Sequence, residues 1–312
     1  MRHHGFSYQA AFRNSLRVKW QIEDLIGGDK TLDFSRPFLP EALAATATLP
    51  GLDRHEKTLL NQIRGHNYLY LFGLVEEFIL PFVLDHVRNR LQAPDIETRA
   101  LLNFAAEEAK HIDLFKRFRA AFEMGFRVPC RVIGPPEAIA EAVLAHHPLS
   151  VALAILQIEW MTQRHYLDSV EGDDSLDPCF KDLLKHHWME EAGHAKLDTL
   201  MVEELAWHLT AAEIAEAVDG YIAIIQILNA GLLQQVEFDL TALQAASGRS
   251  LTEKELAEIR FAQQAAMRWT FLGSGMSHPM FRATLGGISR QGAVRVDALA
   301  GIFGRPESVV AG

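Results

Sequence analysis

Two copies of one short motif hold the residues that are best suited to chemistry in this chain. The first Glu-x-x-His motif consists of Glu108 and His111, and the second, 83 residues later, of Glu191 and His194. Glutamate and histidine three positions apart share one face of an α-helix. Carboxylates and imidazoles are the ligand types that suit iron, manganese and zinc. The two motifs therefore predict metal binding.

Two single glutamates extend this pattern with the same spacing. Glu76 and Glu159 are also 83 residues apart, and each lies 32 residues before its Glu-x-x-His motif. Both lie in strongly apolar stretches, residues 69–83 and 151–161, so we expect their carboxylates to be buried. A buried carboxylate without a partner is unfavourable by several kcal/mol. A metal cation is the simplest partner; hydrogen bonds or a distant arginine are the alternative.

Dinuclear metal sites in four-helix bundles use two Glu-x-x-His pairs and two single glutamates. Each half of this chain is expected to supply most ligands of one metal, with Glu108 and Glu191 bridging the two metals, because carboxylates can bind in several modes. Glu77 is an alternative to Glu76, since it lies in the same apolar stretch and Pro81 can rotate the helix locally.

A third histidine is a candidate for the same site. His187 lies four residues before Glu191 and seven before His194, so the three side chains share one helical stripe. The corresponding position in the first half of the chain is Phe104. His187 is expected to be a seventh ligand; the alternative is a histidine outside the site, as expected for its neighbour His186.

Capping signals and helical periodicity predict the elements that position these residues. Four long helices are expected, at residues 54–91, 95–124, 148–170 and 179–208. The connection 126–147, with a short helix at 136–146, is long enough to cross the bundle. Two helix hairpins joined by a crossover form a ferritin-like four-helix bundle, so the predicted fold is all-α.

The rest of the chain is expected to add to this bundle. Helices are predicted at 210–248 and 251–273, and the second of them is capped by Ser250 with Glu253. The tail from Gly273 is expected to be irregular or briefly helical. The predicted organisation is an N-terminal extension that packs on the bundle through Trp20 and Ile22 (1–53), the di-metal bundle (54–208), and additional helices in the same domain or at an interface (209–312).

Composition restricts the class of protein. The 312 residues are 49% hydrophobic, and the net charge of −10 offers no basic surface for nucleic acid. The two cysteines form neither a metal-spaced pair nor a disulfide framework. The longest apolar run is interrupted by Glu76 and Glu77, and no apolar leader follows the start of the chain. We expect a cytoplasmic protein without membrane or nucleic-acid partners.

The motif spacing resembles the ferritin-like di-iron carboxylate superfamily over residues 55–208. Within it, the pattern His-x-x-x-Glu-x-x-His at residues 187–194 resembles the p-aminobenzoate N-oxygenase group. The resemblance implies that the metal ligands are Glu76 (or Glu77), Glu108, His111, Glu159, His187, Glu191 and His194. It implies two iron ions or a manganese/iron pair, dioxygen as co-substrate, a peroxo intermediate, and N-oxygenation of a small amine with electrons from an external donor.

Two other functions remain as alternatives. One is a di-iron oxidase that hydroxylates or desaturates carbon. The other is an iron-handling ferroxidase of the ferritin or rubrerythrin type. The Cys-x-x-Cys module of rubrerythrins is not found in the sequence, and a ferritin needs little more than four helices.

Several residues are expected to support the site. Asp198, one turn beyond His194, can accept a hydrogen bond from a ligand histidine. Tyr166, seven residues after Glu159, lies on its helical face, although a plain core tyrosine is the alternative. The expected pocket wall consists of Phe72, Phe104, Ile155 and Leu156. The apolar segment 221–228 is expected to suit a homodimer interface.

Overall fold

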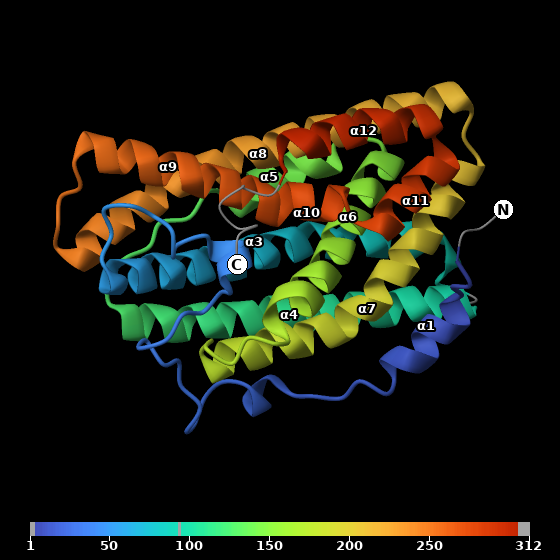
Figure 1. The fold of residues 1–312 in the computed structure, drawn as a ribbon. Helices are drawn as coiled ribbons and strands as arrows, with labels where there is room; N and C mark the ends of the chain where they lie inside the picture. Colours follow the sequence, from blue (N-terminus) through green and yellow to red (C-terminus); the bar gives the residue numbers. More distant parts are fainter. Residues whose placement is uncertain (1–3, 93–94, 305–312) are drawn as a thin grey trace.

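The computed structural model describes residues 4–92 and 95–304, and every long element in them is an α-helix (Figure 1). No β-strand occurs among these described residues, which contain one isolated bridge between Gly27 and Lys30. The prediction of an all-α fold is therefore confirmed.

Two helix hairpins form the centre of the molecule. Their helices are α3 (Arg54–Val87), α4 (Ile96–Phe126), α6 (Pro148–His165) and α7 (Pro178–Trp207). Helix α3 packs on α4, α6 packs on α7, and α4 contacts α7 across the bundle. The connection between the hairpins carries the short helix α5 (Pro136–Leu144). This is the predicted ferritin-like arrangement of two hairpins and a crossover, and the helix bounds agree with the sequence to within a few residues.

Local chemistry explains where these helices begin and end. The Asp53 side chain accepts a hydrogen bond from the Glu56 backbone N–H, and the Glu56 side chain accepts one from the Asp53 backbone N–H. This is the capping box that the sequence predicts. Helix α4 continues past Gly125 and ends where Arg127 adopts a left-handed conformation. The third helix turns into a π-helical segment at Tyr166–Val170, inside the range that was predicted as one α-helix.

Helix α3 is long and strongly apolar. Over Arg54–Arg90 it is the one stretch among the described residues with the length and composition of a membrane span. In the structure, 67% of its most apolar window is buried inside the protein, where α3 contacts α4 and α8. This is the burial of a core helix in a bundle, which supports the expectation that the chain lies outside the membrane; the cytoplasmic location stays a prediction.

The C-terminal third of the chain covers one side of the bundle, drawn in yellow to red in Figure 1. It consists of α8 (Ala211–Ser247), α9 (Glu253–Arg268), a π-helical segment (Trp269–Gly273), α10 (Ser274–Met276), α11 (Pro279–Ile288) and α12 (Arg290–Ile302). Helix α8 packs on both α3 and α6. The sixth predicted helix begins two residues later than expected, because the capping box is made by Thr252 and Glu255.

The sequence predicts an irregular or briefly helical tail after Gly273, and the described part of this tail is mostly helical. Three helices follow Gly273, and α10 and α11 pack on α6. A Cβ atom on Gly275 would lie 2.4 Å from the Gln157 carbonyl oxygen, so this glycine permits close contact between α10 and α6. Gly275 therefore serves helix packing.

The first part of the N-terminal extension runs along the opposite side of the bundle, and its second part returns to contact α3 and α9 (Figure 1). It contains α1 (Tyr8–Ser15), a 3₁₀ turn (Ile22–Asp24) and the short α2 (Glu41–Ala44). Helix α1 packs on α4 and α7. Trp20 and Ile22 are both buried, as the sequence predicts.

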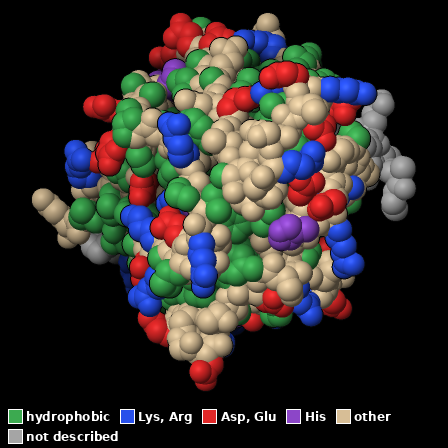
Figure 2. All heavy atoms as spheres, turned by 90° about the vertical axis from the view of Figure 1, so that its left-hand side faces the viewer, with side chains coloured by type: hydrophobic (Ala, Val, Ile, Leu, Met, Phe, Trp, Pro, Cys, Tyr) green, Lys and Arg blue, Asp and Glu red, His purple; other side chains and the backbone are tan. Residues whose placement is uncertain are grey.

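The apolar segment 221–228 is used largely within the chain. Tyr221, Ile224 and Ile225 are buried in the core, and Ile227 is 37% exposed. The segment therefore offers less apolar surface to a second copy than the sequence suggested, and the homodimer stays a prediction. Figure 2 shows one face of the molecule, on which acidic and basic side chains are interspersed among apolar ones.

Candidate metal centre

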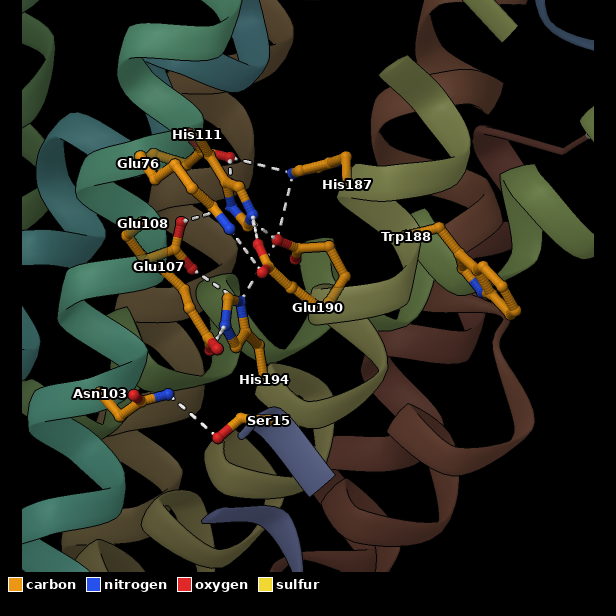
Figure 3. A network of polar contacts seen from close by, with 12 residues as sticks. Ser15, Glu76, Asn103, Glu107, Glu108, His111, His187, Trp188, Glu190 and His194 are labelled. Atoms are coloured by element: carbon orange, nitrogen blue, oxygen red, sulfur yellow. Dashed lines mark hydrogen bonds and ion pairs between the residues drawn. The ribbon is translucent and has the colours of Figure 1, made fainter. Parts of the chain in front are cut away.

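Seven predicted ligand side chains from all four bundle helices lie in the interior, and Figure 3 labels five of them: Glu76, Glu108, His111, His187 and His194. Helix α3 supplies Glu76, α4 supplies Glu108 and His111, α6 supplies Glu159, and α7 supplies His187, Glu191 and His194. None of these residues is more than 3% exposed. Six of the seven offer ligand atoms close to one another, and Glu159 lies outside these groups as a neighbour of Glu191.

The donor atoms form two groups that share ligands. In the first, the Nε2 of His187 lies 3.1 Å from both Glu76 Oε1 and Glu191 Oε1, beside His111. In the second, the Nδ1 of His194 lies 3.0 Å from Glu108 Oε1 and 3.2 Å from Glu191 Oε1. The His111 Nδ1 is 3.1 Å from the same Glu191 oxygen. Glu191 thus contacts all three imidazoles, as a bridging carboxylate would.

His187 joins the group of Glu76, so it lies opposite the single glutamate of the first hairpin. The sequence pattern assigns most ligands of one metal to each half of the chain, whereas both of these groups combine residues of the two hairpins. The two groups share His111 and Glu191, and Glu108 lies close to both His111 and His194. The bridging role of Glu108 and Glu191 stays a prediction.

Glu76 and Glu77, the two alternatives for the first helix, have different surroundings. Glu76 is 2% exposed and faces His187 and His111. The Glu77 side chain is 34% exposed and forms an ion pair with Lys116, with 3.0 Å between Oε1 and Nζ. The helix thus places Glu76 in the cluster and Glu77 at its outer surface.

The unpaired polar atoms of the cluster match the needs of bound cations. Both carboxylate oxygens of Glu108, one oxygen each of Glu76, Glu159 and Glu191, and the Nδ1 atoms of His111 and His194 are buried and make no hydrogen bond. Such groups are costly to bury unless something positive lies between them. Four carboxylates carry a formal charge of about −4, which two divalent cations would balance. The donor set therefore fits a pair of metal ions.

A pair of carboxylates that the sequence analysis did not select holds the two motif histidines. The Nε2 of His194 lies 2.9 Å from Glu107 Oε2, and the Nε2 of His111 lies 2.8 Å from Glu190 Oε2. In both cases Nδ1 faces the cluster. Metal-binding histidines are commonly oriented by a carboxylate on the other ring nitrogen. The available signal was the doubled glutamate, because both motifs read Glu-Glu-Ala-x-His in full.

The N-terminal extension packs against His111 and the residues that orient it. The Trp20 ring stacks on His111, with 6.2 Å between centroids and an angle of 4°. The Lys110 ammonium lies 3.7 Å from the centre of the Trp20 ring and also bonds to Glu190. The extension therefore shields one imidazole from solvent and helps to fix the carboxylate that orients it.

Asp198 and Tyr166 do not have the roles that the sequence predicted for them. Asp198 is fully buried near the cluster, but neither nitrogen of His194 bonds to it, because Nε2 turns to Glu107. Burial raises the pKa of Asp198 well above its usual range. Tyr166 stacks on Trp188 at 4.4 Å, away from the cluster. Tyr166 lies about two helical turns beyond Glu159, where α6 ends and the π-helical segment begins.

The residues predicted to form the pocket wall are all buried, but they contact different parts of the site. Phe104 packs on His194 with 4.2 Å between ring centroids. Ile155 and Leu156 are fully buried. Phe72 contacts His187 edge-on at 5.4 Å and also lines a cavity on its other side. The cluster thus has apolar side chains against its imidazoles.

Electrostatics in the cluster favour the binding of protons or of cations. Burial, followed by the Glu108 carboxylate, raises the pKa of Glu76 to about 8. Burial and then Glu191 raise the pKa of Glu159 well above its usual range. Burial alone would lower the pKa of His111, but its carboxylate neighbours outweigh this and raise it well above its usual value. Cations that replace these protons would relieve the same excess of negative charge, so metal binding should release protons.

Comparison with known proteins identifies similar folds only. No protein family and no curated protein matches the sequence. Among solved structures, one variant of an R2-like ligand-binding oxidase with a Mn/Fe cofactor is 14% identical, with 87% of this chain and 98% of that chain covered and a TM-score of 0.43. Another variant is 15% identical over 86% and 99%, with a TM-score of 0.42. The assignment of the site therefore rests on the geometry of this chain.

Proposed function

We propose that this protein is an oxidoreductase that uses a dinuclear metal centre and dioxygen to oxidise a small organic molecule. The observation that carries the proposal is the buried cluster of four carboxylates and three imidazoles, in which several oxygen and nitrogen atoms make no hydrogen bond. The ligands would be Glu76, Glu108, His111, Glu159, His187, Glu191 and His194. A site that only needed structural cross-linking would be satisfied by a single closed metal with four ligands.

The metals would be two iron ions or a manganese and an iron ion. When bound, they would supply the electrons that reduce dioxygen. The chain itself does the rest: Glu107 and Glu190 fix the orientation of the imidazoles, and Phe104, Phe72 and Trp20 keep bulk water from them. A dry, preorganised cluster of this kind suits chemistry with a reactive oxidant.

The specific reaction that we propose is N-oxygenation of a small amine. Support comes from His187, which contacts Glu76 and Glu191 and gives the cluster its third imidazole. An external electron donor, a cytoplasmic location and a homodimer belong to the same proposal. Hydroxylation or desaturation at carbon is the alternative reaction for the same centre.

Metal analysis combined with absorption spectroscopy tests the proposal. The full chain, loaded anaerobically with ferrous iron, should hold two metal ions, and a transient visible band should appear when dioxygen is added. A double Glu108→Gln and Glu191→Gln variant should lose both properties while keeping its helical circular dichroism spectrum. Steady growth of a ferric mineral beyond two irons per chain would instead indicate iron handling, and wild-type protein that binds no metal would refute the proposal.

A further inference from the structure

A cavity lies against the proposed centre, on the side where α3 and α6 face α8. Its volume is about 180 Å³, and its wall is formed by α3, α6, α8, the crossover around α5 and the π-helical segment at 269–273. Met161 and Leu272, at its inner end, are no more than 1% exposed. Ile227 and Gln234 also line it and are exposed, so they mark its mouth.

One aromatic ring separates this cavity from the metal cluster. Phe72 lines the cavity and is 3% exposed, and its ring edge meets the His187 imidazole at 5.4 Å. On both α3 and α6, a residue that lines the cavity is also the direct sequence neighbour of a cluster residue. The lining residues Val75 and Ile158 directly precede the cluster residues Glu76 and Glu159. A molecule in the cavity would therefore lie next to the centre, with Phe72 between them.

The chemistry of the wall limits what can occupy the cavity. None of the residues that line it is charged, and Gln234 at the mouth has the only polar side chain among them. A carboxylate placed inside would lose its hydration without gaining a cation. In size the cavity resembles an engineered apolar cavity of about 150 Å³ that binds benzene.

We propose that this cavity holds the substrate, and that the substrate is an uncharged, apolar compound about the size of one substituted ring, not a carboxylic acid. This inference rests on the proposed function for its use in catalysis. A substrate of this class differs from an amine that carries a carboxylate, because no residue that lines the cavity offers a positive charge to bind that carboxylate. Phe72 is then a specificity-determining residue, since it sets how close the occupant comes to His187.

Two matched probes test the class of ligand. p-Toluidine and p-aminobenzoate have the same ring and amine, but one carries a methyl group where the other carries a carboxylate. We expect p-toluidine to bind the full chain at least ~100-fold more tightly, as measured by calorimetry on metal-loaded and on metal-free protein. Equal or tighter binding of p-aminobenzoate would overturn the inference.

Variants locate the binding. Gly231→Leu and Leu228→Phe each add side-chain volume to the cavity wall and should weaken p-toluidine binding at least ~10-fold. Gly301→Leu adds the same group where nothing lies within 4 Å, and should leave binding unchanged. Wild-type affinity in both wall variants would place the ligand elsewhere. Metal content is measured on the same samples, so that failure of the metal site and failure of the cavity proposal are distinguished.

Discussion

Glu107 on α4 holds His194 on α7, with 2.9 Å between Glu107 Oε2 and His194 Nε2. The reverse contact also exists, since Glu190 on α7 holds His111 on α4 at 2.8 Å. Each hairpin thus orients the ligand histidine of the other. The two motifs are related in space as they are in sequence, and the position of each imidazole depends on the packing of the hairpins.

Removing these outer carboxylates should weaken metal binding without destroying the cluster. Glu107→Gln and Glu190→Gln keep the size of each side chain but remove the charge that favours the Nε2–H tautomer of the histidine. We expect metal affinity to fall about 10–100-fold in each variant. Metal titration in a competing chelator measures this change. Glu137→Gln, which alters an exposed glutamate of α5, is the control and should bind as the wild type does.

The neighbouring residues Glu76 and Glu77 should respond very differently to the same substitution. Glu76→Gln removes a charge that faces His187, so one metal should bind at least ~10-fold more weakly. Glu77→Gln removes a surface partner of Lys116, which contributes about 0–1 kcal/mol to stability. Metal stoichiometry by plasma emission spectroscopy compares the two variants. Loss of metal in Glu77→Gln alone would reverse the assignment.

Two adjacent histidines offer a similar comparison for the seventh ligand. His187→Ala should weaken one metal and shorten the lifetime of any absorbing species that forms with dioxygen, because the first donor group loses an imidazole. His186 instead contacts the Asp182 carbonyl oxygen at 2.7 Å, so His186→Ala should keep the metal content and spectra of the wild type. Identical metal content and spectra in His187→Ala would remove His187 from the ligand set.

The sequence predicts the centre well where one helix alone sets the geometry. Glutamate and histidine at i and i+3 share a face in any α-helix, so both motifs and His187 could be placed without knowing the packing. The roles of Glu107 and Glu190 could not be predicted in this way. Each side chain bonds to a histidine of the other hairpin, so its partner depends on how α4 packs on α7. Asp198 was a plausible partner by helical spacing, but the orientation of the His194 ring selects Glu107.

Tertiary contacts account for the other differences from the sequence. Tyr166 lies at the end of α6 and stacks on Trp188, a neighbour that a count of seven residues from Glu159 does not predict. The tail after Gly273 has the glycine content of a loop. In the structure two of its glycines, Gly275 and Gly292, closely approach another helix, a property that only tertiary packing reveals.

A buried histidine should make the protein sensitive to acid. Burial and then Arg119 lower the pKa of His66 to about 3, whereas an unfolded histidine titrates near 6.5. Between these values the unfolded chain binds more protons than the folded one. The contribution of His66 is therefore fully present above pH 6.5 and is lost as pH falls toward 3, by up to about 1.4 kcal/mol per pH unit.

The variant His66→Phe isolates this effect. His66 stacks on Phe122 at 4.7 Å, so a phenyl ring has a place in the same site. The free energy of unfolding of the wild type, minus that of the variant, should decrease as pH falls from 6.5 to 4 and stay constant above pH 7. Urea denaturation at a series of pH values measures it. A difference that does not change with pH would show that His66 is solvated or charged in the folded protein.

The close contact of α10 with α6 should make Gly275 intolerant of a side chain. In Gly275→Ala the new Cβ would lie 2.4 Å from the Gln157 carbonyl oxygen and 3.1 Å from the Met161 Cβ, so the two helices would have to separate. Overpacking of this kind costs about 1–3 kcal/mol. Gly301→Ala in α12 meets nothing within 4 Å and should raise stability by up to about 1 kcal/mol, because alanine favours a helix over glycine. Thermal unfolding of both variants compares them directly, and a Gly275→Ala protein as stable as Gly301→Ala would show that α10 packs more loosely on α6 than the structure indicates.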